Sequence, residues 1–259
     1  MVDACRREAM PKTCSTHSIG TNLMTVLLVL ALSLTGFVAP STAQGPDFVS
    51  VLDKMRERMG NVIDYQCRFR TFSTDGTQSR EVLLAYYYRN PSQIRMEVLE
   101  GPSPGSILIY NRRLQPEQVR VIAGNKFTAL MQRMFYGEFF PLNNKWVLDL
   151  RGNGIHESDW PNFVEEHEKY LSIGSSRFIG EETLNGRSTY LFKLVSNKPD
   201  ETMSIKEEEV WVDTRNYFPV QFFQYDTQGR IARRTTITEL RFNTGLDERL
   251  FVEFHPKLE

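Results

Sequence analysis

The alternation of apolar and polar positions predicts a chain built mainly from antiparallel strands, preceded by one helix. Between Phe48 and Met59, apolar residues recur at helical spacing, which is typical of an amphipathic helix. Residues 61–72 then alternate strictly, which predicts a strand. The inward face of this strand is expected to carry Ile63, Tyr65, Cys67 and Phe69. On that face Cys67 is interpreted as a small buried hydrophobic side chain rather than a reactive thiol.

A hairpin signal at Asp75-Gly76 leads into a strand that is apolar on both faces between Val82 and Tyr88. Such a strand needs cover on both sides. An alternating segment over residues 93–100 and two further short strands follow before residue 125, without a helical period between them. This pattern predicts a meander of antiparallel strands.

The period changes to that of a helix over residues 125–137, where the apolar stripe consists of Phe127, Leu130, Met131, Met134 and Phe135. Two interpretations remain open for this stripe. It either packs as ordinary core or forms a lid whose methionine-rich face tolerates varied apolar partners. A loop over residues 143–158 then leads to a third short helix, predicted over residues 160–171.

Strands return after residue 172, with an Asn185-Gly186 turn signal between two of them. Asp213 and Asp226 fall where predicted strands end. We therefore interpret these two aspartates as turn residues rather than as a catalytic pair.

The N-terminus has the features of a secretory signal peptide over residues 1–43. Basic residues precede an apolar stretch from Leu23 to Val38, which is shorter than the roughly 20 residues that a membrane-spanning helix needs. Small residues at Ser41 and Ala43 predict cleavage after Ala43 and export to the periplasm. The alternative is an uncleaved N-terminal anchor. The remaining residues, 44–259, are expected to form one domain.

Composition and motifs exclude several classes of function. The formal net charge of −1 does not favour nucleic acid as a partner. Neither His156 nor His167 lies in an HExxH motif, so no metal site is predicted, and no motif indicates a cofactor. The acidic residues Glu165, Glu166 and Glu168 are expected on a solvated helix face, and Glu207, Glu208 and Glu209 at the start of an exposed strand.

One short motif has the spacing of an esterase nucleophile. Residues 101–105, GPSPG, match the elbow pattern G-x-S-x-G around Ser103. However, Pro104 lacks the N–H that the oxyanion hole would need, and the residues that follow are predicted to form a strand rather than a helix. We therefore do not expect an enzyme.

Taken together, the predicted signal peptide, first helix, antiparallel meander and C-terminal segment resemble the LolA/LolB-like lipoprotein-localisation superfamily. The resemblance is firmest over residues 205–256, and the hairpin at residues 64–76 is similar to the start of an uncharacterised branch. The residues that carry it are Trp211, Asp213, Pro219, Asp226, Gly229, Asn243, Leu246, Phe251, Phe254 and Pro256. The implied fold is α+β, an open antiparallel β half-barrel with helices covering its concave face.

The resemblance further implies a monomeric periplasmic protein that holds lipid acyl chains or lipoproteins in an apolar cavity between sheet and helices. Envelope membrane proteins are further expected partners. An alternative of another class is a non-enzymatic envelope scaffold or sensor with the same fold. The side chains expected to contact lipid are Phe127, Leu130, Met131, Met134, Phe135, Tyr86 and Tyr88.

Overall fold

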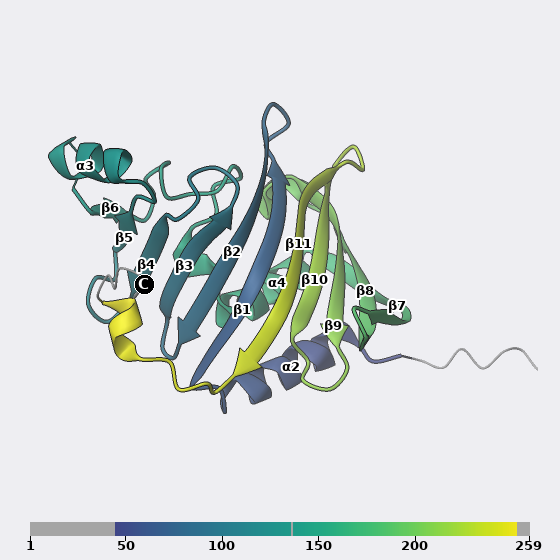
Figure 1. Cartoon of the computed structure of the whole chain (residues 1–259). Helices are drawn as coiled ribbons and strands as arrows, with labels where there is room; N and C mark the ends of the chain where they lie inside the picture. Colours follow the sequence, from purple (N-terminus) through teal and green to yellow (C-terminus); the bar gives the residue numbers. More distant parts are fainter. Residues whose placement is uncertain (1–44, 136, 253–259) are drawn as a thin grey trace, which may run out of the picture. The chain divides into compact units, whose positions relative to one another are not determined.

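The computed structural model describes residues 45–135 and 137–252, so the predicted signal peptide lies outside the described residues. One antiparallel sheet of 11 strands dominates this part of the chain, in the order β6-β5-β4-β3-β2-β1-β11-β10-β9-β8-β7 (Figure 1). Its two ends do not pair with each other. The sheet therefore forms the open half-barrel that the sequence implied.

The strands follow the chain as a meander on each side of a central pair, β1 and β11. Their bounds are β1 Asp64–Thr74, β2 Ser79–Arg89, β3 Gln93–Glu100, β4 Ile107–Asn111, β5 Gln118–Ile122, β6 Phe139–Pro141, β7 Gly174–Leu184, β8 Arg187–Ser196, β9 Ile205–Asp213, β10 Pro219–Asp226 and β11 Ile231–Phe242. The predicted strands are confirmed, and the short β6 is an addition. Pairing of β1 with β11 brings the first and last strands together at the centre of the sheet.

Two helices cover one half of the concave face. Helix α2 (Phe48–Met59) and helix α4 (Trp160–Ser172) lie behind the half of the sheet that runs β1-β11-β10-β9-β8-β7 in Figure 1. Asp159 caps α4 by accepting a hydrogen bond from the backbone N–H of Asn162. The core beneath these helices is rich in stacked rings: Tyr65 lies 3.8 Å from Trp160 and 4.7 Å from Tyr88 between ring centroids.

The start of β1 differs from the prediction. Ile63 is 65% exposed, whereas Asp64 is buried. The Asp64 carboxylate accepts hydrogen bonds from the backbone N–H groups of Thr244, Gly245 and Leu246. Because this carboxylate anchors the segment that follows β11, the polar residue is internal and the apolar one is displaced to the surface. Cys67 is buried, as predicted.

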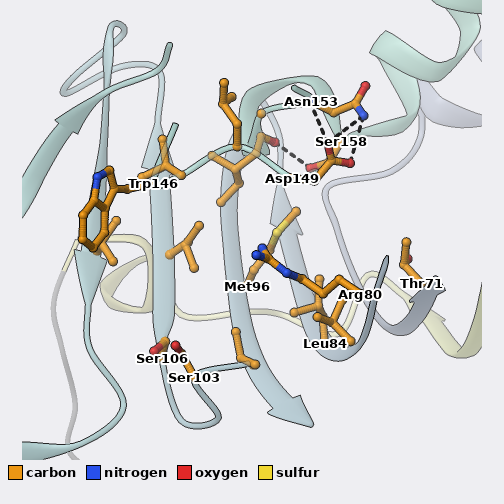
Figure 2. Close-up of a pocket in the computed structure, with 18 of the residues that line it drawn as sticks. Thr71, Arg80, Leu84, Met96, Ser103, Ser106, Trp146, Asp149, Asn153 and Ser158 are labelled. Atoms are coloured by element: carbon orange, nitrogen blue, oxygen red, sulfur yellow. Dashed lines mark hydrogen bonds between the residues drawn. The ribbon is translucent and has the colours of Figure 1, made fainter. Parts of the chain in front are cut away.

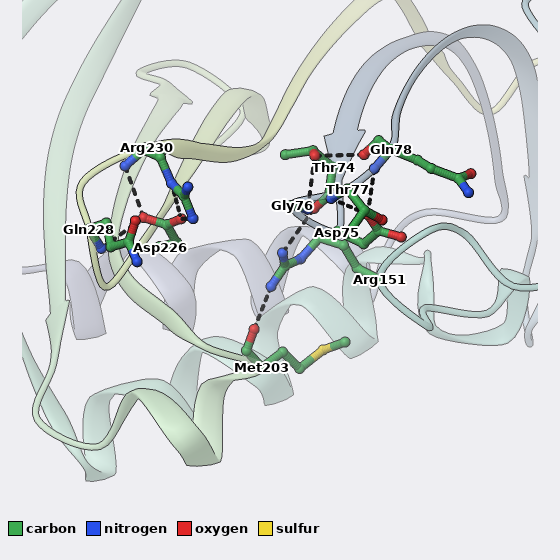
Figure 3. A network of polar contacts seen from close by, with 10 residues as sticks. All are labelled: Thr74, Asp75, Gly76, Thr77, Gln78, Arg151, Met203, Asp226, Gln228 and Arg230. Carbon is green, nitrogen blue, oxygen red and sulfur yellow. Dashed lines mark hydrogen bonds and ion pairs between the residues drawn. The ribbon is translucent and has the colours of Figure 1, made fainter.

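The other half of the concave face is covered by a segment with little regular structure. We call residues 142–159 the strap; they contain one short 3₁₀ helix, η1 (Ile155–Glu157). Arg151 fastens the strap at two points, because its guanidinium donates to the carbonyl of Thr74 in the β1–β2 hairpin and to that of Met203 (Figure 3). The strap therefore bridges two loops at the edge of the concave face.

Aspartates close the neighbouring turns. Asp226 ends β10 and accepts hydrogen bonds from the N–H groups of Gln228 and Arg230 (Figure 3). Asp213 ends β9 and accepts from Arg215 and Asn216 in the same way. Both aspartates are turn residues, as the sequence predicted. Among the described residues, no helix is long and apolar enough to span a membrane.

Candidate functional site

A cavity of about 830 Å³ lies between the strap and the concave face of strands β1 to β6 (Figure 2). Cavities of about 300–1,000 Å³ are typical of small-molecule binding sites. This cavity occupies the half of the sheet that α2 and α4 leave uncovered. It is therefore the leading candidate for a ligand site in the described protein.

The walls of the cavity are largely apolar. Side chains that point to the same face of neighbouring strands form the floor, because residues two apart on a strand share a face. These are Val82, Leu84, Met96, Val98, Leu108, Val121 and Phe140. The strap contributes the opposite wall through Trp146, Val147, Leu148 and Ile155. Such a wall suits a flexible apolar ligand rather than a polar metabolite.

Charged groups line the cavity next to the β1–β2 hairpin, while Ser103, Ser106, Gln132 and Lys145 line it elsewhere. Arg80 and Arg233 line the cavity next to the hairpin, and Asp149 lies across from Arg233 with 4.0 Å between Oδ2 and Nη2. The Asp149 carboxylate also accepts hydrogen bonds from the N–H of Arg151 and from Asn153, which shapes the strap (Figure 2). The cavity thus has an apolar floor and a group of charged side chains next to the β1–β2 hairpin.

A smaller pocket of about 110 Å³ adjoins the cavity and runs beneath α4. At this pocket, the buried His167 places its Nε2 atom 3.4 Å from Oε1 of the buried Glu208. The Nδ1 atom of the ring lies 2.7 Å from the carbonyl oxygen of Phe163. No hydrogen bond joins Nε2 to Oε1, but at this distance the charge of the carboxylate favours the protonated ring.

The titration of His167 reflects two opposing effects. Burial by itself lowers the pKa of His167, but the charge of the adjacent Glu208, the contact with the Phe163 carbonyl and the charge of Glu166 outweigh it, so the pKa is raised. Glu208 itself corrects the sequence prediction, since it is buried rather than part of an exposed strand end. Its position on β9 faces α4, and His167 provides the charge that makes its burial tolerable.

The predicted lid helix exists as α3 (Lys126–Phe135), which lies beside β5 and β6 at one end of the sheet (Figure 1). Leu130 is 57% exposed and Met134 is 66% exposed, while Gln132 lines the cavity and donates to the carbonyl of Val121. The side chains of three further predicted residues lie outside what the structure describes, namely Phe127, Met131 and Phe135.

Tyr86 and Tyr88, the other two predicted lipid contacts, belong to the packed core. They are 0% and 2% exposed and do not line the cavity. Their burial raises the pKa of both phenols, with that of Tyr88 at about 12. The apolar pattern of β2 pointed to a strand that does line the cavity. The residues of β2 that line it, Val82 and Leu84, lie nearer the start of the strand than Tyr86 and Tyr88.

Sequence reasoning missed most of the cavity wall. The alternation in β3 and β5 placed Met96 and Val121 on a defined face, which is the signal that could have identified them, whereas β4 is apolar on both faces around Leu108. No local signal indicated the strap residues Val147 and Ile155, because an irregular segment has no period. Their place depends on tertiary contacts.

Ser103 lies in the loop between β3 and β4, with a φ of 62°. The strand β4 follows it, so the strand–turn–helix context of a nucleophile elbow does not occur at this serine. Within residues 45–135 and 137–252, no group of three or more histidine, cysteine, aspartate or glutamate side chains is arranged to hold a metal ion.

No family model and no curated protein matches this sequence. Similar solved structures include an uncharacterized conserved protein from Thermus thermophilus, at 14% identity with a TM-score of 0.49, covering 80% of this chain and 93% of that one. A putative outer membrane lipoprotein-sorting protein domain from Vibrio parahaemolyticus matches at 13% identity and a TM-score of 0.37, covering 77% of this chain and 95% of that one.

A LolA superfamily protein from Nitrosomonas europaea matches at 10% identity and a TM-score of 0.36, covering 80% of this chain and 98% of that one. The sequence identity to these structures is low. The description of the cavity rests on the residues of this chain alone. The chain is thus similar to structures that include LolA superfamily and lipoprotein-sorting proteins, and it has the open half-barrel that its sequence resemblance implies.

Proposed function

We propose that this protein is a non-enzymatic binder or carrier of lipids or lipoproteins that holds acyl chains in the cavity beneath the strap. The single observation that carries the proposal is the cavity of about 830 Å³, whose floor and strap walls are apolar. Apolar side chains left facing an open space in a folded domain are favourable sites for an apolar ligand, since its burial removes both surfaces from water.

The setting follows from the sequence. Residues 1–43 resemble a signal peptide, so we place the protein in the periplasm, with residues 44–259 forming one domain. There it would receive acyl chains from one membrane component and deliver them to another. Helix α3, at the edge of the cavity through Gln132, would shield bound acyl chains from water.

A pair of tryptophan substitutions tests the proposal. Leu84 points into the cavity, whereas its neighbour Leu83 points to the opposite face of β2, and both are half-buried. We expect wild-type protein to bind a fluorescent fatty-acid probe, Leu84→Trp to reduce the affinity at least about tenfold by filling the space, and Leu83→Trp to leave it near wild type.

Two results would count against the proposal. Absence of probe binding by the wild-type protein would remove the binder function and favour the alternative of an envelope scaffold or sensor. Equal affinities for the two tryptophan variants, with both folded by circular dichroism, would place any bound probe outside this cavity.

A further inference from the structure

Two arginines and a serine form one row across the three central strands of the sheet. Ser73 of β1 is paired directly with Arg80 of β2 on one side and with Arg233 of β11 on the other. Directly opposed residues of antiparallel strands point to the same face, with Cβ atoms about 4.5–5.5 Å apart. All three residues line the cavity. The row therefore presents two guanidinium groups on either side of one hydroxyl group.

The two guanidinium groups retain donors for a ligand. The side chain of Arg80 makes no hydrogen bond or ion pair with any residue in the described part of the chain, and Figure 2 draws it among the cavity residues. The Nε atom of Arg233 is buried and has no hydrogen-bond partner among the described residues. A buried donor without a partner is costly, so it marks a place where a ligand oxygen would be stabilised.

Carboxylates also line the cavity, but among the described residues none of them forms an ion pair with Arg80. Asp149 forms an ion pair with Arg233 at 4.0 Å, which offsets part of the charge of that guanidinium group, and it also accepts hydrogen bonds from Arg151 and Asn153 within the strap. Glu157 accepts from the backbone N–H of Gly154. Glu166 is exposed on α4, where solvent screens its charge.

The neighbouring rows of paired residues become less polar with distance from this row. In the next row, Thr71 lies between Val82 and Thr235, and the two threonine hydroxyl oxygens are 3.1 Å apart. The row after that consists of Leu84, Phe69 and Ile237 and is entirely apolar. The cavity is therefore amphipathic, with cationic side chains near the β1–β2 hairpin and an apolar floor.

We propose that Arg80, Ser73 and Arg233 form a subsite for the anionic head group of an acyl-chain ligand, such as a phosphate or carboxylate. Arginine binds both groups through parallel charge-assisted hydrogen bonds, and the serine hydroxyl adds a neutral donor between them. The tail then extends along Leu84 toward the apolar wall. This inference rests on the proposed acyl-chain binding and adds the class of head group to it.

The test compares two ligands with the same palmitoyl chain, lysophosphatidic acid and monoacylglycerol, by titration calorimetry. We expect the wild-type protein to bind the anionic ligand about tenfold more tightly, a preference that decreases as salt rises. The double variant Arg80→Gln/Arg233→Gln is expected to lose the preference while keeping its affinity for monoacylglycerol. The matched control is Arg234→Gln, which changes the adjacent arginine on the opposite face and is expected to behave as wild type.

The single variant Arg80→Gln is a control for misfolding of the double variant. The Arg80 side chain makes no polar contact with the described residues, so its replacement removes no interaction that stabilises the fold. This variant is expected to lose part of the preference. Suppose that the wild-type protein binds both ligands equally, or that Arg234→Gln reduces the preference as much as the double variant. The proposed head-group subsite is then wrong, whereas the proposal that the cavity binds acyl chains is unaffected. If the wild-type protein binds neither ligand, the proposed function itself fails.

A final arm separates a lipid head group from a free anion. Inorganic phosphate alone is titrated into the wild-type protein and the double variant. We expect no measurable binding, because the acyl chain supplies most of the affinity. Phosphate binding that is as tight as that of lysophosphatidic acid, and that the double variant loses, would assign the row to a free anion and overturn the head-group proposal.

Discussion

At the scale of single residues, two buried carboxylates each lie beside a group of matching chemistry. Asp64 is buried because three backbone N–H groups converge on its carboxylate, and Glu208 is buried beside His167. The Arg80 side chain has no such partner among the described residues although it lines the cavity. The contrast separates residues that hold the fold from residues that are available to a ligand.

The buried pair predicts a specific dependence of stability on pH. The pKa of folded His167 is raised above that of the unfolded chain, which is about 6.5. Its contribution to stability is therefore fully present below about pH 6.5 and disappears as the pH rises through the folded value. We expect His167→Gln to lower the free energy of unfolding by about 3 kcal/mol near pH 5.5 and by clearly less near pH 9.

Urea unfolding at the two pH values measures this difference, and the half-exposed His156 supplies the control through His156→Gln. The control is expected to change stability by less than about 1 kcal/mol at either pH. A loss for His167→Gln that is equal at both pH values would show that the ring acts by packing alone.

Cys67 is predicted to be chemically inert in the folded protein. Burial raises the pKa of its thiol well above the usual range, and the thiolate is the form that reacts. We expect no alkylation of Cys67 by iodoacetamide until denaturant is added, as followed by mass mapping of the peptide that contains it. Rapid labelling of the native protein would contradict the burial of this residue.

At the scale of elements, periodicity predicted where helices and strands form but not which of them meet. The 3.6-residue period located α3, alternation located β1, β3 and β5, and apolar runs located β2 and β4, because these patterns arise from local geometry. The strap has no period, so nothing in its sequence placed Val147 or Ile155 against the sheet. Tyr86 and Tyr88, which we predicted as ligand contacts, lie in the packed core instead of lining the cavity, because a buried face looks the same from sequence whether side chains or a ligand fill it.

Helix α3 provides an element-scale test of the lid proposal. Leu130 and Met134 are more than half exposed, so Leu130→Ala/Met134→Ala is expected to change the free energy of unfolding by less than about 1 kcal/mol. If α3 shields acyl chains, the same variant weakens binding of the fatty-acid probe severalfold. A loss of several kcal/mol with unchanged probe affinity would identify α3 as core.

At the scale of the whole domain, the sheet is covered in two different ways. Helices α2 and α4 fill one half of the concave face with a packed core, while the strap leaves a cavity over the other half. The open half-barrel itself could be predicted, since it follows from the meander and from the family resemblance. The uneven filling could not, because it depends on side-chain volumes that meet only in the folded chain.

The central claim is that this cavity holds acyl chains, and native mass spectrometry of protein purified from its own cell envelope tests it most directly. The account predicts wild-type protein with mass adducts that fragment to acyl-chain lipids, and Leu84→Trp protein, purified in the same way, with those adducts strongly reduced. Leu83→Trp protein should retain them. Wild-type protein that carries no lipid, under conditions where a known lipid-binding protein keeps its own, would contradict the account.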